Sequence, residues 1–444
     1  MNTPICDYVD AYKKSETLRL HMPGHKGSSF LGVEALDITE IEGADSLYEA
    51  AGIIRESEDN AGSLFGCATL FSTEGSSQCI RAMLYLAMLA GKKVGREMVI
   101  LAAGNVHKTF LSAAALLGID VEWMYPPKQD TYLSCNLTAE LVEGYLKKST
   151  ARPMAVYLTS PDYLGNIAPV KGIAEVCHRY GVLLLVDNAH GAYLKFLPEG
   201  LHPIDLGADM CCDSAHKTLP VLTGGGYLHI AKGEDFFKSR AKDALALFGS
   251  TSPSYLILQS LDMANRYISE GYGERLEKTL NSISETRKNI EELGFNLYGS
   301  EPLKITILPK SHGQTGFRLA KILQENHIMT EFADKDALVL MFTPENTERD
   351  FERLVSVLSG IARQTEIWET APAVGRPKAE LSIREAIFAE TELIPATDSL
   401  GRIFAGFGIA CPPAVPLVVG GERIDENLLD CFEYYDIKEC RVIK

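Results

Sequence analysis

Residues 209–227 read D-M-C-C-D-S-A-H-K-T-L-P-V-L-T-G-G-G-Y. The apolar beginning is typical of a buried strand, and a hydroxyl, an imidazole and an amine follow it in Ser214, His216 and Lys217. Within one turn of chain, these groups can hold a phosphate and bond covalently to an aldehyde. Upstream, residues 183–187 (L-L-L-V-D) form a second buried-strand pattern, which ends on the carboxylate of Asp187.

A lysine and an acid that follow buried strands are what pyridoxal phosphate (PLP) requires from its protein. Lys217 would bond to the cofactor aldehyde, and Asp187 would keep the pyridine nitrogen protonated so that the ring can accept electrons. Each residue also has a plainer interpretation. Most lysines are solvated surface charges, and a strand-end Asp can cap a helix or anchor a loop. The two signals together predict a PLP-dependent enzyme.

Strands and helices alternate through the first half of the chain. This alternation predicts an α/β fold with a mostly parallel sheet and helices on both faces. The expected strands are 66–71, 97–102, 121–125, 154–159 and 182–186, and the expected helices are 4–18, 78–90, 106–117, 138–147 and 170–180. In such sheets, ligands bind at the carboxyl ends of the strands. The polar residues that follow expected strand ends are His107, Ser160, Asp187, His190 and those at 214–217.

A small, hydroxyl-rich turn at residues 72–77 (S-T-E-G-S-S) precedes the expected helix 78–90. Backbone N–H groups at a helix N-terminus bind anions, so Ser76 and Ser77 are candidates for holding a phosphate. A plain N-cap is the commoner use of such a turn. His107, after Gly104-Asn105, is a candidate for stacking on the cofactor ring, and its alternative is a capping or core histidine.

Residues 256–292 contain long amphipathic segments, a suitable bridge to a smaller domain. Expected strands at 304–308 and 338–343, with a helix at 317–326 between them, predict a small α+β unit. The predicted division is an N-terminal arm (1–30), a large PLP-binding domain (31–270), a small α+β domain (271–365) and a separate C-terminal domain (366–444).

Composition narrows the class of protein. The 444 residues are 46% hydrophobic and 23% charged, with a net charge of −16 that argues against nucleic-acid binding. The ten cysteines include no Cys-x-x-Cys pair, which favours reduced core cysteines over disulfides or a metal site. The first residues lack a signal-peptide pattern, and no apolar run reaches the ~20 residues of a membrane span. We therefore expect a cytoplasmic protein without a membrane partner.

Several motifs, taken in order, resemble those of the PLP-dependent ornithine/lysine/arginine decarboxylases, and the resemblance covers nearly the whole chain. The chain looks like the short form, without the N-terminal wing domain of larger members. The motifs are His21-Met22-Pro23-Gly24-His25-Lys26-Gly27, Gly75-Ser76-Ser77, Asn105-Val106-His107-Lys108, Asp187-Asn188-Ala189-His190-Gly191, Ser214-Ala215-His216-Lys217-Thr218-Leu219, Ser250-Thr251-Ser252-Pro253-Ser254-Tyr255 and Pro412-Pro413.

The resemblance implies a fold-type I (aspartate-aminotransferase-like) enzyme that acts on an amino acid as a homodimer or larger assembly with shared active sites. It also implies that the C-terminal domain (366–444) is decarboxylase-like. It implies that Lys217 bonds to PLP, that Asp187 pairs with the pyridine nitrogen, and that His190 lies near the substrate carboxylate. The other implied cofactor contacts are His107 on the ring, Ser76, Ser77, Ser214 and His216 on the phosphate, and Thr251 or Ser252 on the phosphate of the neighbouring subunit.

Glu331 matches an acidic residue that meets the distal cation of the substrate in relatives; a solvated charge before a strand is its plainer interpretation. Three positions depart from the family pattern and bear on substrate choice. Asn188 stands where Glu is usual, Cys411 stands where an aromatic residue precedes the Pro-Pro pair, and 414–416 (A-V-P) replaces Gly-Ile-Pro.

The first functional hypothesis is decarboxylation of arginine, lysine or ornithine to an amine. A second is another PLP reaction on the same scaffold, such as transamination or β-elimination, because a fold does not determine the reaction. An aminotransferase places an arginine against the substrate carboxylate, and Arg318 and Arg402 are available. A third is an inactive regulatory homologue, against which the presence of both Lys217 and Asp187 argues.

Overall fold

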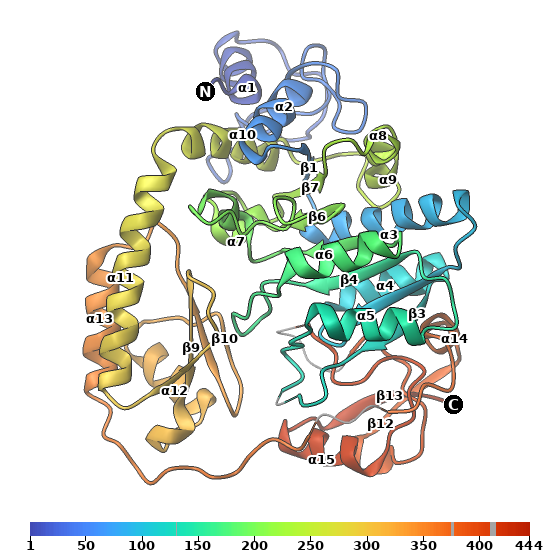
Figure 1. Cartoon of the computed structure of the whole chain (residues 1–444). Coiled ribbons are helices and arrows are strands. Elements are labelled where there is room, and N and C mark those ends of the chain that lie inside the picture. Colours follow the sequence, from blue (N-terminus) through green and yellow to red (C-terminus); the bar gives the residue numbers. More distant parts are fainter. Residues whose placement is uncertain (130, 374–376, 409–413) are drawn as a thin grey trace. The chain divides into compact units, whose positions relative to one another are not determined.

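The computed structural model describes residues 1–129, 131–373, 377–408 and 414–444 (Figure 1). The chain divides into two compact units. The first comprises residues 1–97, 152–158 and 170–274, and the second comprises residues 98–151, 159–169 and 275–444. The Pro412-Pro413 motif and Cys411 lie outside the described residues.

In the described residues, strands β1 to β7 belong to a mostly parallel seven-stranded sheet, as the alternation of elements predicts. In the first unit, β5 pairs in parallel with β6, whereas β7 is antiparallel to both β6 and β1. In the second unit, β2 and β3 pair in parallel. The strands are β1 (Ala68–Ser72), β2 (Val99–Ala103), β3 (Asp120–Met124), β4 (Ala155–Thr159), β5 (Leu183–Asp187), β6 (Met210–Asp213) and β7 (Gly226–Ile230).

Burial explains why the central strands carry continuous apolar runs. Every residue of β6 and β7 is buried, and since side chains alternate along a strand, both faces of the sheet must be covered here. Helix α3 (Gly75–Lys93) packs against β1, β5, β6 and β7, and α6 (Val170–Arg179) packs against β5. The expected fold class is confirmed.

Three helices of the first unit differ from expectation. Helix α1 (Pro4–Lys14) ends before residue 18, because Glu16 adopts a left-handed φ of 54° that a helix cannot continue through. Helix α2 (Ile53–Phe65) was not expected. Helix α3 begins at Gly75 rather than at residue 78, so Ser76 and Ser77 lie in its first turn.

The remaining helices of the first unit are short or come after the last strand of the sheet in the chain. They are α7 (Ala215–Thr218), α8 (Asp235–Lys238), α9 (Ala241–Ala246) and α10 (Tyr255–Ser269). Helix α11 (Tyr272–Glu292) continues into the second unit, and the boundary between α10 and α11 falls within the expected amphipathic stretch 256–292. The second unit also holds α4 (Lys108–Leu117) and α5 (Ala139–Lys148), close to their expected bounds.

The expected small α+β unit is present in the second unit. Its antiparallel sheet has the strand order β10-β11-β9-β8 and is accompanied by α12 and α13. The C-terminal segment adds two helices and a two-stranded antiparallel sheet. The elements are β8 (Asn296–Tyr298), β9 (Lys304–Leu308), α12 (Gly316–Glu325), β10 (Phe332–Ala333), β11 (Leu338–Met341), α13 (Glu348–Ser359), α14 (Ile383–Phe388), β12 (Thr391–Pro395), α15 (Glu426–Tyr434) and β13 (Glu439–Ile443).

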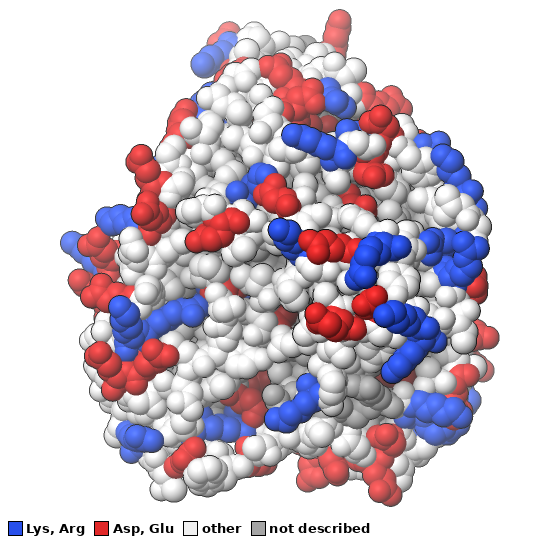
Figure 2. Space-filling model, viewed as in Figure 1, with Lys and Arg blue, Asp and Glu red and all other residues white. Residues whose placement is uncertain are grey.

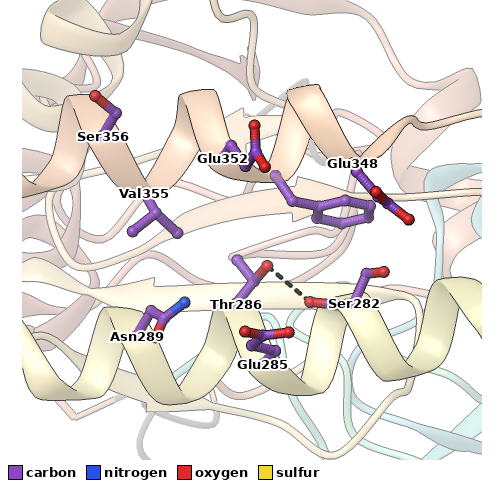
Figure 3. A pocket seen from close by; sticks show the side chains of 9 residues that line it. Ser282, Glu285, Thr286, Asn289, Glu348, Glu352, Val355 and Ser356 are labelled. Carbon is purple, nitrogen blue, oxygen red and sulfur yellow. Dashed lines mark hydrogen bonds between the residues drawn. The ribbon is translucent and has the colours of Figure 1, made fainter.

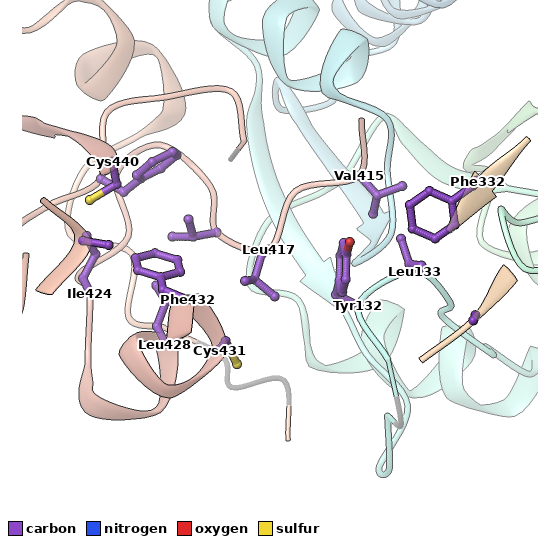
Figure 4. Packing of buried hydrophobic residues seen from close by; sticks show 14 of the residues in the cluster. Tyr132, Leu133, Phe332, Val415, Leu417, Ile424, Leu428, Cys431, Phe432 and Cys440 are labelled. Carbon is purple, nitrogen blue, oxygen red and sulfur yellow. The ribbon is translucent and has the colours of Figure 1, made fainter. Parts of the chain in front are cut away.

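A buried apolar cluster joins distant segments of the second unit (Figure 4). Tyr132 and Leu133 contribute from the loop after β3, and Phe332 contributes from β10. Leu417 and Phe432 contribute from the C-terminal segment. This burial removes apolar surface from water and anchors the C-terminal segment to the rest of the unit.

Charged side chains of both signs are interspersed over the face shown in Figure 2, so the net negative charge is not gathered into one patch there. Most of the described cysteines are buried and form no disulfide among the described residues: Cys67, Cys79, Cys177, Cys211, Cys212, Cys431 and Cys440. Among the described residues, no helix combines the length and the apolar character needed to cross a membrane.

Candidate active site

The structure brings Lys217 and His190 together. Lys217 lies on α7, which follows β6 directly, and His190 lies in the turn after β5. The Nζ atom of Lys217 is 2.9 Å from Nε2 of His190, and the His190 side chain is buried. An amine and an imidazole at hydrogen-bond distance can exchange a proton.

Asp187 is the last residue of β5 and is buried. Its Oδ1 accepts hydrogen bonds from the backbone N–H of Ala189 (3.2 Å) and from the thiol of Cys212 (3.7 Å). Burial raises the pKa of the Asp187 carboxyl, and the nearby charge of Lys217 opposes this rise. A cationic ring nitrogen would oppose it further, because an opposite charge favours the carboxylate.

A group of hydroxyls surrounds the N-terminus of α3, which no side chain caps. The Ser214 hydroxyl donates to Oγ of Ser76 at 2.8 Å. Nδ1 of His216 lies 2.8 Å from the carbonyl oxygen of Gly225, and burial, together with Lys217, lowers the pKa of this imidazole. Such a site has donors and a helix dipole suited to a phosphate.

Two glycines allow this close arrangement. Gly75 has a φ of 66°, which favours glycine, although a Cβ placed on it would make only an ordinary contact of 3.6 Å with Cε1 of His216. A Cβ on Gly226 of β7 would come within 2.9 Å of the Gly75 carbonyl carbon and 3.0 Å of the Asp213 carbonyl oxygen. The start of α3 therefore packs directly on the backbone of β7.

His107, in the second unit, caps α4: its Nδ1 accepts a hydrogen bond of 3.1 Å from the backbone N–H of Thr109. The capping interpretation of His107 is confirmed, and its stacking role stays a prediction. With Nδ1 acting as the acceptor, the proton of the neutral ring is on Nε2.

Thr251 and Ser252 are exposed in the loop between α9 and α10. The backbone N–H of Ser250 donates to Oε1 of Glu74 at 2.6 Å, and that of Ser252 donates to Oγ of Ser250 at 3.1 Å. Because Glu74 precedes α3, the loop is attached beside the α3 N-terminus of its own chain. The contact of Thr251 or Ser252 with a neighbouring subunit stays a prediction.

Glu331, in the second unit, lies just before β10. Its Oε1 accepts a hydrogen bond of 3.0 Å from the hydroxyl of Tyr163, whose ring packs edge-on against Phe332 at 5.3 Å. Glu331 also lines a cavity of about 370 Å³ that includes Asp350. Glu331 is exposed, so the structure is compatible with the plainer interpretation of a solvated charge, and its role in substrate binding stays a prediction.

A cluster not expected from the sequence lies directly behind Ser214. Oδ2 of Asp213 accepts from Nε2 of His229 at 3.0 Å and from Nε2 of His202 at 3.2 Å, and its Oδ1 accepts from Nδ2 of Asn188 at 2.7 Å. All four side chains are buried. A metal ion could in principle be held here, because the ligand atoms of His202, Cys211 and Asp213 lie close together. However, the His202 imidazole and the Asp213 carboxylate are already hydrogen-bonded to each other.

Another cavity, of about 490 Å³, lies between α11 and α13 (Figure 3). Its wall includes Glu285 and Glu352, and the Thr286 hydroxyl donates to the carbonyl oxygen of Ser282 at 2.8 Å. None of the expected site residues lines this cavity, so we do not assign the cofactor site to it. Arg402, one of the arginines available to an aminotransferase, instead pairs with Glu392 of β12 at 2.6 Å.

A family model described as Orn/Lys/Arg decarboxylase, major domain, matches residues 3–306. The chain belongs to the Orn/Lys/Arg decarboxylase family. An arginine decarboxylase of Bacillus subtilis is 31% identical over 469 residues, which cover 98% of this chain and 94% of the relative. The fold matches that of a lysine decarboxylase from Francisella novicida with a TM-score of 0.82 at 19% identity, over 100% of this chain and 81% of the other.

A cysteine desulfurase from Thermococcus onnurineus shares the fold at a TM-score of 0.56 and 18% identity, over 80% of this chain and 90% of its own. The fold is thus that of PLP fold-type I proteins. This Orn/Lys/Arg decarboxylase family member is a PLP-dependent amino-acid decarboxylase, which favours the first functional hypothesis over the other two.

The residues of the first unit fit PLP. A phosphate would meet the hydroxyls of Ser76 and Ser214 at the uncapped start of α3. An aldehyde would meet the Lys217 amine, and a protonated ring nitrogen would satisfy the buried carboxylate of Asp187. The phosphate, the aldehyde and the ring nitrogen of the cofactor therefore each have a candidate partner of suitable chemistry.

Proposed function

We propose that this decarboxylase removes the α-carboxylate of arginine and releases CO2 and agmatine. The observation that carries the proposal is the contact of Lys217 with His190 beside the buried carboxylate of Asp187. The choice of arginine is supported by the similarity to the Bacillus subtilis arginine decarboxylase. The carboxylate of Glu331 supports it further, because a carboxylate can accept two parallel hydrogen bonds from a guanidinium group.

In the proposed mechanism, PLP supplies an electron sink for the electrons left by the departing carboxylate. Lys217 would hold the cofactor through Nζ, and the carboxylate of Asp187 would balance the positive charge of the protonated ring nitrogen. Nε2 of His190 accepts or returns a proton at Nζ of Lys217, which lets the amine alternate between bound and released forms. Ser76, Ser77, Ser214 and His216 would hold the cofactor through its phosphate, and His107 would stack on its ring.

Glu331 fixes the distal cation of the substrate, and the hydroxyl of Tyr163 keeps the carboxylate of Glu331 in one orientation. Holding the far end of a long, flexible amino acid restricts the orientation of its α-carbon. We further propose a homodimer in which Thr251 or Ser252 reaches the phosphate of the neighbouring subunit.

The substrate is tested by incubating the purified protein, loaded with PLP, with arginine, lysine and ornithine in turn. CO2 and the corresponding amine are measured, and oxo-acid formation is measured in parallel with pyruvate present. We expect the highest kcat/KM with arginine. A preference for lysine or ornithine would contradict the substrate choice, and oxo-acid formation without CO2 would contradict decarboxylation itself.

A further inference from the structure

The cluster around Asp213 connects elements that carry the proposed catalytic residues. Asp213 is the residue before Ser214, on the strand that leads to Lys217, and Asn188 is the residue after Asp187. The hydrogen bond of 2.7 Å from Nδ2 of Asn188 to Oδ1 of Asp213 therefore links the two strand ends at which the cofactor is expected to bind.

Backbone pairing brings the strand ends to the same point. Asp187 lies opposite Cys212 in the parallel register of β5 and β6, and the N–H of Asn188 donates to the carbonyl oxygen of Cys212 at 3.0 Å. The side-chain bond between Asn188 and Asp213 follows immediately after this last backbone contact. This side-chain hydrogen bond extends the pairing of β5 and β6 by one residue, at the point where both strands end.

Two histidines hold Asp213 from other directions. His229 lies on β7, opposite Cys211 in the antiparallel register, and His202 lies in the segment that leads to β6. Burial alone would raise the pKa of Asp213, but the two histidines outweigh burial and lower it. An ionised, fully enclosed carboxylate with three donors has one orientation, because any rotation leaves a buried charge without partners.

We propose that Asp213, with Asn188, His202 and His229, is a positioning unit that fixes the carboxyl ends of β5 and β6 and so holds Asp187 and Lys217 in place for the cofactor. The inference rests on the proposed function, in which Asp187 and Lys217 hold PLP. It also accounts for Asn188, one of the departures from the family pattern. A Glu at residue 188 would place a second carboxylate against Asp213, whereas an amide supplies the donor that Asp213 requires.

The test compares Asp213→Asn and Asn188→Asp with a matched control, Asp209→Asn. Asp209 precedes β6 at its opposite end, and its Oδ2 accepts from the N–H of Leu184 (2.7 Å) and from Nε2 of His178 (3.3 Å). The control thus removes a histidine-paired carboxylate that lies next to the opposite end of β6 from Asp213. The readouts are the PLP dissociation constant, the absorption maximum of bound PLP and the melting temperature of the cofactor-free protein.

We expect Asp213→Asn and Asn188→Asp to weaken PLP binding by about tenfold or more, as is typical when a partner that orients a ligating group is lost. Asp209→Asn should alter the dissociation constant by less than about twofold. The double variant Asn188→Asp/Asp213→Asn restores one carboxylate and one amide with their positions exchanged. It should therefore bind PLP more tightly than either single variant.

Equal effects of Asp213→Asn and Asp209→Asn on PLP binding would overturn the proposal, as would a double variant no better than the singles. If Asp213→Asn gives no cooperative melting transition, Asn188→Ala replaces it, because this variant removes only the bond between the strand ends. Wild-type protein that binds no PLP would overturn the proposed function itself. If instead the wild-type protein binds PLP but Asp213→Asn and Asp209→Asn bind it equally well, only the positioning role of Asp213 is contradicted.

Discussion

Nζ of Lys217 lies 2.9 Å from Nε2 of His190, although Lys217 lies on a helix that follows β6 and His190 lies in a turn that follows β5. A lysine ammonium can only donate hydrogen bonds, so next to a charged Lys217 the Nε2 atom must be the acceptor. When Lys217 is neutral, its amine can instead accept a proton from Nε2. The contact is therefore suited to moving one proton between two defined atoms.

His190→Gln should lower kcat by about a hundredfold, because glutamine retains hydrogen bonding but cannot exchange a proton. PLP should remain bound, since Lys217 and Asp187 are unchanged, and the absorption spectrum reports this. His178→Gln, which changes a histidine half-exposed to solvent, is the control and should keep wild-type kcat. Loss of PLP from His190→Gln would show that His190 contributes to cofactor binding rather than to proton exchange with Lys217.

Ser76→Ala and Ser214→Ala should each weaken PLP binding by about 1 kcal/mol, the usual net value of one hydrogen bond. Because the two hydroxyls are 2.8 Å apart, the double variant should not show the sum of the two effects. Equilibrium titration with PLP measures all three constants, and Ser63→Ala on α2 is the control. Strict additivity would contradict a shared phosphate site.

Glu331→Gln should raise KM for arginine by about tenfold and leave kcat less affected, because the lost charge contacts a part of the substrate that does not react. Tyr163→Phe should act in the same direction but more weakly, since it removes only the bond that orients Glu331. Glu325→Gln, at the exposed end of α12, is the control. A fall in kcat with unchanged KM would argue against a role in substrate binding.

The ion pair of His229 and Asp213 should make stability fall with rising pH. Burial alone would lower the pKa of His229, but Asp213 raises it to about 9 from the ordinary 6.5. The stabilisation is then complete below pH 6.5 and is lost as the pH rises through about 9. The melting temperature of the cofactor-free protein should therefore decrease over this interval. The decrease should be smaller in His229→Gln, and equal slopes would contradict the charged pair.

Mixing two inactive variants tests whether active sites are shared. One variant is Lys217→Ala, and the other is Thr251→Ala/Ser252→Ala. In a mixed dimer with shared sites, one site combines the intact residues of both chains, so random mixing after denaturation and refolding should restore roughly a quarter of wild-type activity. Mixtures that stay inactive would mean that the loop serves its own chain, as its attachment to Glu74 would allow.

Much of the sheet could be predicted because buried parallel strands have continuous apolar sequences. β4 lacks only the first residue of the expected 154–159, and β5 is shifted by one residue from the expected 182–186. In the smaller antiparallel sheet, β9 coincides with the expected 304–308. Helix α2 was missed because only Ile54, Ala61 and Phe65 supply its buried apolar surface, and the polar residues between them obscure the helical period. A left-handed residue such as Glu16 gives no comparable signal in the sequence.

The candidate site also contains residues that could be predicted from the sequence and residues that could not. Asp187 could be predicted because it ends a recognisable strand, and Lys217 could be predicted because it follows one within a few residues. The role of Asp213 could not be, because it depends on which residues face it across the sheet. His202 and His229 are distant from each other in sequence, and only the antiparallel pairing of β7 with β6 brings His229 to the carboxylate.

The contact of Gly226 with Gly75 has a consequence for protein engineering. Since a single added carbon at residue 226 would collide with the backbone of the first residue of α3, this position has no room for variation. In a random library, substitutions at residue 226 would therefore displace the start of α3 whatever their effect on substrate choice. Positions around Glu331, the proposed substrate contact, leave more room for variation, because they line a cavity instead of a packed backbone.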